Sequence, residues 1–471
     1  MRFVVILLAA ALLAGGCGKG DYSKTAGKRK EGVFRYPING TPTTLDPGAV
    51  EDGDTIDLLQ QVFEGLVAYA EDNTIKGILA ESWTISPDGK VYTFKIKQGV
   101  KFHSGRELKA QDFKDTIERN ANPAFQTSTV NSYLTDIVGI KERRAGKAAE
   151  VSGVRVKGDY ELEIEIDQAR PYFLGKLTYP TSWVVDTKAL NGFKRISSVS
   201  EMVGTGPFKA VEYKENDITI LEANEQYHLG APKIRRIERP VMADPQTRLQ
   251  AYQRGSVDLV AMERADVPAV QRNPDLKDQI RLFDRPSIFY VGLNQRVYPA
   301  FKDRRVRQAF AMAINKRRIV EDVLGGLVQE ANSIIPPGVP GHRPNAAVLP
   351  YDPARARKLL AEAGFPNARG LPTFVMEVRV ERQDYVKVAE AAANDLKNNL
   401  GIRIQVQPSE WASYLDKRDK WKIGLFHMRW AADYLDPQNF LSLMLGTYSP
   451  PFGAENKLDY SNPEFDALCK K

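Results

Sequence analysis

Cysteine and histidine are almost absent from this chain of 471 residues, which contains two cysteines and four histidines. The cysteines, Cys17 and Cys469, stand near opposite ends, so the sequence predicts no internal disulfide framework. The histidines are far apart and none pair at helical spacing, so we expect no catalytic zinc site. Motifs of serine hydrolases, zinc proteases and nucleotide-phosphate loops are also missing. We therefore predict a protein that is not an enzyme and that uses no metal or cofactor.

Long apolar runs are missing as well, since no segment reaches the 18 or more residues of a membrane-spanning helix. The run from Phe3 to Ala14 follows Arg2 and leads through small residues to Cys17, the pattern of a short secretory signal. Residues 1–16 are thus predicted to be a signal peptide, and the polar residues 17–32 a flexible tether. The ending before Cys17 resembles the lipobox of bacterial lipoproteins, which implies a lipid anchor on Cys17. A plain cleaved signal is the alternative.

Charge of neither sign is concentrated in this chain. There are 66 Lys and Arg against 59 Asp and Glu, a formal net charge of +7. The excess is spread along the sequence and forms no basic stripe, so we predict no nucleic-acid partner. The apolar fraction of 43% is ordinary for a globular protein, and the length is enough for about three domains.

Strand-like and helix-like patterns alternate along the chain, which indicates an α/β fold. Apolar residues alternate with polar ones in 90–102 and 159–167, as in half-buried strands. Helical spacing follows Asp303, and a second helix is expected from Asp352 as N-cap to Gly364 as stop. A third helix is expected to end at Gly401, followed by a strand over 402–408.

Several ordered stretches resemble family 5 of the bacterial solute-binding proteins, the oligopeptide- and dipeptide-binding receptors of ABC importers. The resemblance covers about residues 33–471, and no single motif carries it alone. The matching stretches are TTLDP (Thr43–Pro47), FEGL (Phe63–Leu66), ILAESWTISPDGKVYTFKIKQGVKFHSGRELKAQDF (Ile78–Phe113), GTGPF (Gly204–Phe208), ANEQYHLGAPKI (Ala223–Ile234), FKDRRVRQAFAMAIN (Phe301–Asn315) and YDPARARKLLAEAGF (Tyr351–Phe365).

The resemblance implies the type II periplasmic-binding-protein fold, with two α/β lobes joined by a hinge, a further inserted domain, and a ligand held between the lobes. Lobe I is expected to comprise residues 33–60 and 188–285, the inserted domain II residues 61–187, and lobe III residues 286–471. Family members usually continue for several dozen residues beyond the point where this sequence stops. Lobe III is therefore expected to be incomplete at its C-terminal end.

The stretch RWAADYLDPQNF (Arg429–Phe440) contains two carboxylates with different expected roles. Asp436 precedes Pro437 and is predicted to cap a short helix. Asp433 is expected in a loop after the strand KIGLFHM. In peptide-binding members of the family, the Asp of a W-x-x-D-Y pattern accepts the free α-amino group of the ligand, and Trp430 and Asp433 match that pattern. An ordinary buried salt bridge is the alternative for Asp433.

Other ligand contacts are implied by the same resemblance. Trp411 and Arg418 correspond to a tryptophan and an arginine that line the family's binding pocket, and Glu51 matches an acidic residue there. Tyr133 is expected near Glu51. The alternatives are core packing for the aromatic residues and an ion pair for Arg418.

Two positions depart from the oligopeptide receptors. His427 stands where a basic residue helps to bind the peptide α-carboxylate, and Tyr385 stands where another carboxylate-binding histidine occurs. A neutral His427 is a weaker anion partner, so the α-carboxylate is expected elsewhere, with Arg382 as a candidate. Packing on the strand is the alternative for His427.

We therefore expect an exported receptor, on the periplasmic or cell-surface side of the membrane, that captures peptides and delivers them to the permease subunits of an ABC importer as a monomer. Two alternatives stay open. One is a receptor of the same fold for a nickel chelate, haem, an opine or an oligosaccharide. The other is a non-functional truncated lipoprotein, or one that binds partner proteins or unfolded chains.

Overall fold

The structure is a computed structural model that describes residues 31–190, 192, 194–344, 346, 349–446 and 456–469. The predicted signal peptide, Cys17 and nearly all of the tether lie outside these residues. The described chain divides into two compact units, an N-terminal unit that ends at Val241 and a C-terminal unit that begins at Met242. The predicted division into lobe I, domain II and lobe III stays a prediction. Within the described ranges, no helix has the length and apolarity needed to cross a membrane.

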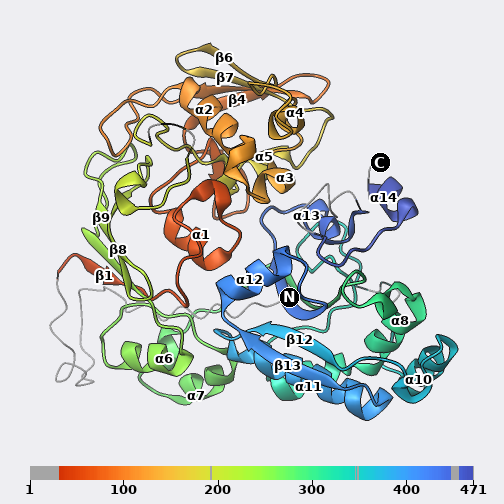
Figure 1. Cartoon of the computed structure of the whole chain (residues 1–471). Helices are drawn as coiled ribbons and strands as arrows, with labels where there is room; N and C mark the ends of the chain where they lie inside the picture. The colour runs from red at the N-terminus through yellow and green to blue at the C-terminus, as the bar shows by residue number, and fades with distance from the viewer. Residues whose placement is uncertain are drawn as a thin grey trace. The chain divides into compact units, whose positions relative to one another are not determined.

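The N-terminal unit contains two four-stranded sheets and a two-stranded one (Figure 1). In the first sheet β1 pairs in parallel with β10, and β9 and β8 continue it in antiparallel order. The second sheet, in the order β4-β5-β7-β6, is antiparallel throughout. The strands are β1 (Val33–Arg35), β2 (Val67–Tyr69), β3 (Ile75–Gly77), β4 (Ala80–Ile85), β5 (Val91–Ile96), β6 (Val154–Gly158), β7 (Glu161–Glu165), β8 (Phe208–Lys214), β9 (Ile218–Ala223) and β10 (Arg236–Pro240).

Alternating burial in this unit confirms the two strands predicted from the sequence. In β5, Phe94 and Ile96 are buried, and in β7 Leu162 and Ile164 are buried, so each strand turns one face to the core. The helices of the unit are α1 (Gly53–Leu59), α2 (Ala110–Asn120), α3 (Thr129–Tyr133), α4 (Ile140–Arg144) and α5 (Phe173–Lys176). Its 3₁₀ turns are η2 (Pro47–Ala49), η3 (Pro123–Phe125), η4 (Pro180–Ser182) and η5 (Val199–Glu201).

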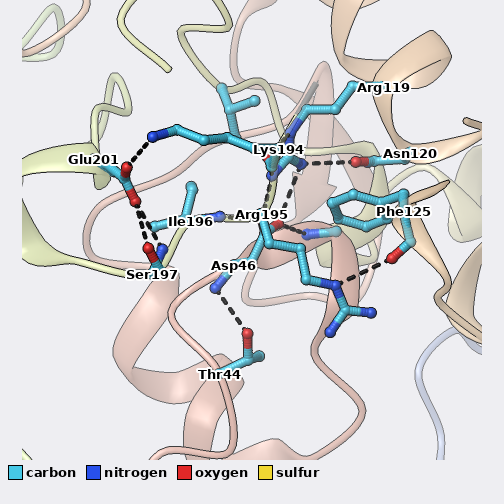
Figure 2. Close-up of polar contacts among 12 residues, drawn as sticks. Thr44, Asp46, Arg119, Asn120, Phe125, Lys194, Arg195, Ile196, Ser197 and Glu201 are labelled. Atoms are coloured by element: carbon cyan, nitrogen blue, oxygen red, sulfur yellow. Dashed lines mark hydrogen bonds and ion pairs between the residues drawn. The ribbon is translucent and has the colours of Figure 1, made fainter. Parts of the chain in front are cut away.

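A buried ion pair between Asp46 and Arg119 joins the TTLDP stretch to helix α2 (Figure 2). Both side chains have no exposed surface. Asp46 also accepts hydrogen bonds from the backbone of Gly48 and Ile196, each at 2.8 Å. Arg119 donates to the carbonyl of Lys194 at 2.8 and 3.0 Å. The pair therefore fixes three chain segments that are far apart in sequence.

A second buried carboxylate, Glu64, connects three of the stretches that resemble family 5. It accepts hydrogen bonds from Thr205 Oγ1 at 2.8 Å and from Tyr227 Oη at 2.7 Å, and His228 Nε2 lies 3.1 Å away. These partners come from GTGPF and ANEQYHLGAPKI, and Glu64 itself from FEGL. Gly204 packs so closely that an added Cβ would lie 2.0 Å from the Val62 carbonyl oxygen. These stretches thus have a structural role in the unit.

The C-terminal unit is built on one four-stranded sheet in the order β11-β14-β12-β13. Strand β12 is parallel to both β13 and β14, whereas β11 is antiparallel to β14. A sheet of this kind with helices on it confirms the expected α/β class. The strands are β11 (Ser287–Leu293), β12 (Phe374–Arg379), β13 (Ile404–Ser409) and β14 (Leu425–Ala431).

The helices of this unit start and stop largely where the sequence predicts. Asp303 and Asp352 cap α8 and α10 through their carboxylates, and Gly401 ends α11 with φ of 73°. The α-helices are α6 (Pro245–Gln253), α7 (Val267–Arg272), α8 (Arg304–Ala313), α9 (Lys316–Arg318), α10 (Pro353–Glu362), α11 (Gln383–Leu400), α12 (Trp411–Asp419), α13 (Gln438–Leu441) and α14 (Pro463–Cys469). The 3₁₀ turns are η6 (Arg264–Asp266), η7 (Lys277–Gln279), η8 (Pro299–Lys302), η10 (Pro366–Ala368) and η11 (Ser442–Met444), and η9 (Ile319–Val323) is a π-helical turn.

Strand β14 contributes to two different cores because its side chains alternate between the faces of the sheet. Leu425 belongs to the cluster that α8, α10 and α11 cover. Phe426 and Met428 belong to the cluster that includes Tyr414 and Leu415 of α12. The RWAADYLDPQNF motif begins in the last three residues of β14 and continues beyond the strand, so its position is fixed by a central strand.

Candidate functional site

The loop after β14 is organised by one buried amide, Asn439, which is 2% exposed. Its Oδ1 accepts from Trp430 Nε1 at 3.0 Å and from the backbone N–H of Asp433 at 3.1 Å. Its Nδ2 donates to Asp433 Oδ2 at 3.4 Å. The prediction that Asp433 lies in a loop directly after this strand is confirmed. Asn439 was not predicted, because no local pattern in the sequence marks it as the partner of Trp430 and Asp433.

Asp436 differs slightly from its predicted place. Helix α13 starts at Gln438, with Pro437 as N-cap, so the helix begins one residue later than predicted. The Asp436 carboxylate still accepts from the backbone N–H of Gln438 at 2.8 Å. It therefore stabilises the first turn as a capping side chain does.

Trp411 begins helix α12 and forms an aromatic stack. Its ring lies 5.3 Å from that of Tyr414 at 19°, and the guanidinium of Arg379 lies 4.7 Å from its centre. Glu381 holds this arrangement, since it accepts from the Trp411 backbone N–H at 2.9 Å and from Arg379 Nε at 3.2 Å. The indole Nε1 is buried and has no hydrogen-bond partner among the described residues.

Arg418, in the last turn of α12, is 9% exposed. Its Nη2 lies 3.1 Å from Asp419 Oδ1, and its Nη1 lies 3.5 Å from the sulfur of Met428. Arg418 therefore forms an ion pair with Asp419, as the alternative interpretation of this arginine predicts.

His427 lies on β14 among aromatic rings, with Tyr385 at 5.4 Å and Phe289 at 5.9 Å between ring centres. The imidazole is 2% exposed, and neither ring nitrogen has a hydrogen-bond partner within the described part of the chain. Burial lowers the pKa of His427 to about 4, so the ring is neutral at pH 7. This is the environment that the packing alternative predicts.

Tyr385 of α11 is surrounded by positive charge. Burial alone would raise its pKa, but the guanidinium groups of Arg429, Arg382, Arg264 and Arg379 hold the pKa of Tyr385 below its ordinary value. These arginines therefore favour a negatively charged group near the phenol.

Arg264 is the most buried member of this arginine group, with 6% exposure. It forms an ion pair with Asp384, and its guanidinium lies 5.3 Å from the centre of the Phe289 ring. Asp384 directly precedes Tyr385 at the start of α11, so one acidic side chain offsets part of the charge around the phenol.

The N-terminal unit places Tyr133 against Tyr179, with ring centres 3.6 Å apart and the rings nearly parallel. The Tyr179 hydroxyl donates to the Val50 carbonyl at 3.0 Å. Glu51 follows Val50 and is partly exposed. Tyr133 is therefore linked, through one intervening tyrosine, to the backbone next to Glu51, and the ligand roles of Tyr133 and Glu51 stay predictions.

Comparison with known proteins decides the family. Residues 74–451 match the model of bacterial extracellular solute-binding proteins, family 5. This chain belongs to that family. Among curated relatives, the family 5 chain is 28% identical to heme-binding protein A of Haemophilus influenzae, with 100% of this chain and 88% of the relative covered. It is 27% identical to the oligopeptide-binding protein OppA of Bacillus subtilis, with 99% and 87% covered.

Solved structures agree with the family. A periplasmic oligopeptide-binding protein of Borrelia burgdorferi superposes on this family 5 protein with a TM-score of 0.84 at 26% identity, covering 93% of this chain and 87% of the other. OppA of Listeria monocytogenes, bound to peptide, superposes with a TM-score of 0.82 at 23% identity, covering 94% and 88%. The expected periplasmic-binding-protein fold is confirmed, and the protein is an extracytoplasmic solute-binding receptor. The ligand roles of individual residues stay predictions.

Proposed function

We propose that this family 5 protein is a peptide-binding receptor of an ABC importer, and that Asp433 accepts the ligand's free α-ammonium group. The observation that carries the proposal is the loop after β14. Its carboxylate is oriented by Asn439, which itself is held by Trp430 through an indole N–H bond of 3.0 Å. Relatives named as oligopeptide- and dipeptide-binding proteins support the same class of ligand.

The chemistry of this pair is favourable because an ammonium has three donors and a carboxylate accepts short, charge-assisted hydrogen bonds. The hydrogen bond from Asn439 Nδ2 to Asp433 Oδ2 is long, at 3.4 Å. A rigid loop loses little conformational freedom when a ligand binds, so more of the electrostatic energy appears as affinity.

We also propose that the ligand's negative end lies toward the arginines around Tyr385, with Arg382 as its principal partner. Neutral His427 supplies no charge there, whereas the arginines lower the pKa of Tyr385 in spite of its burial. Guanidinium groups bind carboxylates in a planar, two-bond geometry that an imidazole cannot match. Trp411 and Arg418 are proposed to line the pocket, and Glu51 and Tyr133 are proposed as further ligand contacts.

Calorimetric titration with short peptides tests the proposal. Each peptide is measured with a free and with an acetylated α-amino group, on the wild type and on Asp433→Asn. We expect acetylation and the substitution each to weaken binding by about 2–5 kcal/mol, and the acetylated peptide to be nearly insensitive to the substitution. Equal affinity of free and acetylated peptides would rule out Asp433 as the ammonium partner.

Asp436→Asn is the matched control, because it makes the same chemical change three residues away in the same loop. Asp436 bonds the first turn of α13 and has no proposed ligand role. We expect its peptide affinity to stay within a few-fold of the wild type. A loss as large as that of Asp433→Asn would show that the loop's fold, and not the carboxylate at 433, is being measured.

Haem is a second candidate ligand, favoured by the 28% identity to heme-binding protein A. A titration of the protein with hemin, followed by the Soret band, addresses it directly. Saturable binding of hemin, together with peptides that produce no heat, would replace the peptide proposal and leave the family assignment unchanged.

Delivery to permease subunits, attachment to the membrane through Cys17, and a monomeric state belong to the same proposal. The family assignment supports the first, and the small-residue sequence before Cys17 supports the second. Palmitate labelling of the wild type and of Cys17→Ala in a bacterial host tests the anchor, since only the wild type should incorporate label.

A further inference from the structure

Helix α12 ends in a two-bond motif that normally contains glycine. The backbone N–H of Lys422 donates to the carbonyl of Lys417 at 2.8 Å, and that of Trp421 donates to the carbonyl of Arg418 at 3.0 Å. These two bonds define a Schellman motif whose central residue is Trp421. Its φ is 58°, in the left-handed region.

A tryptophan is an unfavourable choice at this position. In the left-handed conformation the Cβ of any L-residue crowds the following carbonyl oxygen, whereas glycine has no Cβ. A bulky residue in this region is an outlier, and such strain is found where it serves a function. The side chain of Trp421 should therefore contribute something that glycine would not.

The contacts of Trp421 are cationic. The Arg296 guanidinium lies 5.2 Å from the centre of the indole, and the Lys457 ammonium lies 6.0 Å away. Lys420 and Lys422, on either side in sequence, are both exposed, as is Arg296. We call Arg296, Lys420, Trp421, Lys422 and Lys457 the Trp421 patch.

Acidic residues offset only part of this charge. Lys457 pairs with Asp419 at 3.1 Å, and Lys420 pairs with Asp416 at 2.5 Å. Asp419 is shared with Arg418, so one carboxylate serves two cations. The Lys420 pair is exposed on both sides and is therefore weak. The surface around the indole thus has an excess of positive charge.

We propose that the Trp421 patch is a docking surface for anionic phospholipid headgroups. Tryptophan with lysine and arginine is the combination that proteins place at the level of the headgroups. Lysine is depleted from protein–protein interfaces, so a surface with exposed Lys420 and Lys422 next to Trp421 fits a membrane better than a protein partner. The proposal goes beyond ligand binding, and no residue of the patch belongs to the candidate peptide site.

The test is sedimentation of the full chain with vesicles of phosphatidylcholine alone or with 30% phosphatidylglycerol. We expect stronger binding to the anionic vesicles, weakened by salt as for any screened surface interaction. Lys420→Gln and Lys422→Gln should each weaken it by about five-fold, the value of one charge near an anionic bilayer. The N-terminal residues are common to all variants, so differences between variants report on the patch.

Trp421→Gly is the decisive variant, because it removes the side chain and relieves the left-handed strain together. We expect weaker vesicle binding with an unchanged or raised Tm and with peptide titrations like those of the wild type. Lys387→Gln and Lys397→Gln, made singly at two exposed lysines of α11, are the charge-matched controls for the lysine variants, and each should bind as the wild type does.

Three results would overturn the proposal. These are equal binding to neutral and anionic vesicles, equal losses in the α11 controls and the patch variants, or a lowered Tm in Trp421→Gly with vesicle binding unchanged. Failure of peptide binding alone would leave the proposal standing, because the vesicle assay does not depend on the peptide ligand.

Discussion

The buried pair of Asp46 and Arg119 gives the sharpest prediction of stability. Substitution of Arg119 by Met keeps much of the side-chain volume and removes the charge. The Asp46 carboxylate then stays at 0% exposure without its cation, and the donors that remain to it in the described part of the chain are the backbone N–H groups of Gly48 and Ile196. Removing one partner of a buried pair costs about 3–5 kcal/mol. The change also leaves the Lys194 carbonyl without the two bonds that it accepts from Arg119.

That loss should be visible in a thermal melt. For a unit of this size, 1 kcal/mol shifts Tm by about 2–4 °C, so the melt of the N-terminal unit should fall by about 6–20 °C. Scanning calorimetry gives the size of the change, and hydrogen exchange of the α2 amides assigns it to this unit. Asp46→Ala should cost a similar amount, and the double variant should cost about 2 kcal/mol less than the sum of the two single losses.

Lys214→Met is the control, because Lys214 is 62% exposed in its ion pair with Glu212. An exposed pair contributes about 0–1 kcal/mol, so this variant should melt close to the wild type. If Arg119→Met cost no more than Lys214→Met, the argument that burial makes the Asp46 pair important would be refuted.

Three further predictions follow from the geometry. Asn439→Ala should weaken peptide binding by about ten-fold in titrations, because the carboxylate-bearing loop loses its orienting amide, and should lower stability by about 1–3 kcal/mol, because the N–H donors of Trp430 and Asp433 lose their acceptor. Gly204→Ala should lower stability by more than about 2 kcal/mol in urea, since its Cβ would lie 2.0 Å from the Val62 carbonyl oxygen. Burial lowers the pKa of His427 to about 4, below the value of about 6.5 expected in the unfolded chain. The stability contributed by the neutral imidazole is therefore complete above about pH 6.5, and it falls by about 1.4 kcal/mol per pH unit as the pH drops toward 4. His427→Phe should remove that part of the slope in urea titrations, and an unchanged slope would contradict it.

The helices and strands were predictable where local chemistry decides them. Asp303 and Asp352 cap helices because their carboxylates reach backbone N–H groups of the first turn, and Gly401 ends α11 because it accepts a positive φ. The alternation in β5 follows from one face being buried. The place of Asp433 after β14 was predictable for the same reason, since a strand pattern ended just before it.

Tertiary partners were not predictable in this way. Nothing local marks Asn439 as the amide that binds both Trp430 and Asp433, because the hydrogen bonds depend on how α13 turns back toward β14. The positive surroundings of Tyr385 were equally hidden, since Arg264 is 121 residues before it in the chain. Spatial proximity of charges from separate elements leaves no periodic signal in a sequence.

The pairing of β1 with β10 has a consequence for how the protein must fold. Val33 pairs with Arg236, so the first strand of the described residues finds its partner about 200 residues later. Contacts this distant in sequence slow folding, because a long loop must close before they form. While the chain is being synthesised or exported, β1 has no native neighbour, and an unpaired strand can associate with other chains. The protein should therefore refold slowly and lose yield as its concentration rises.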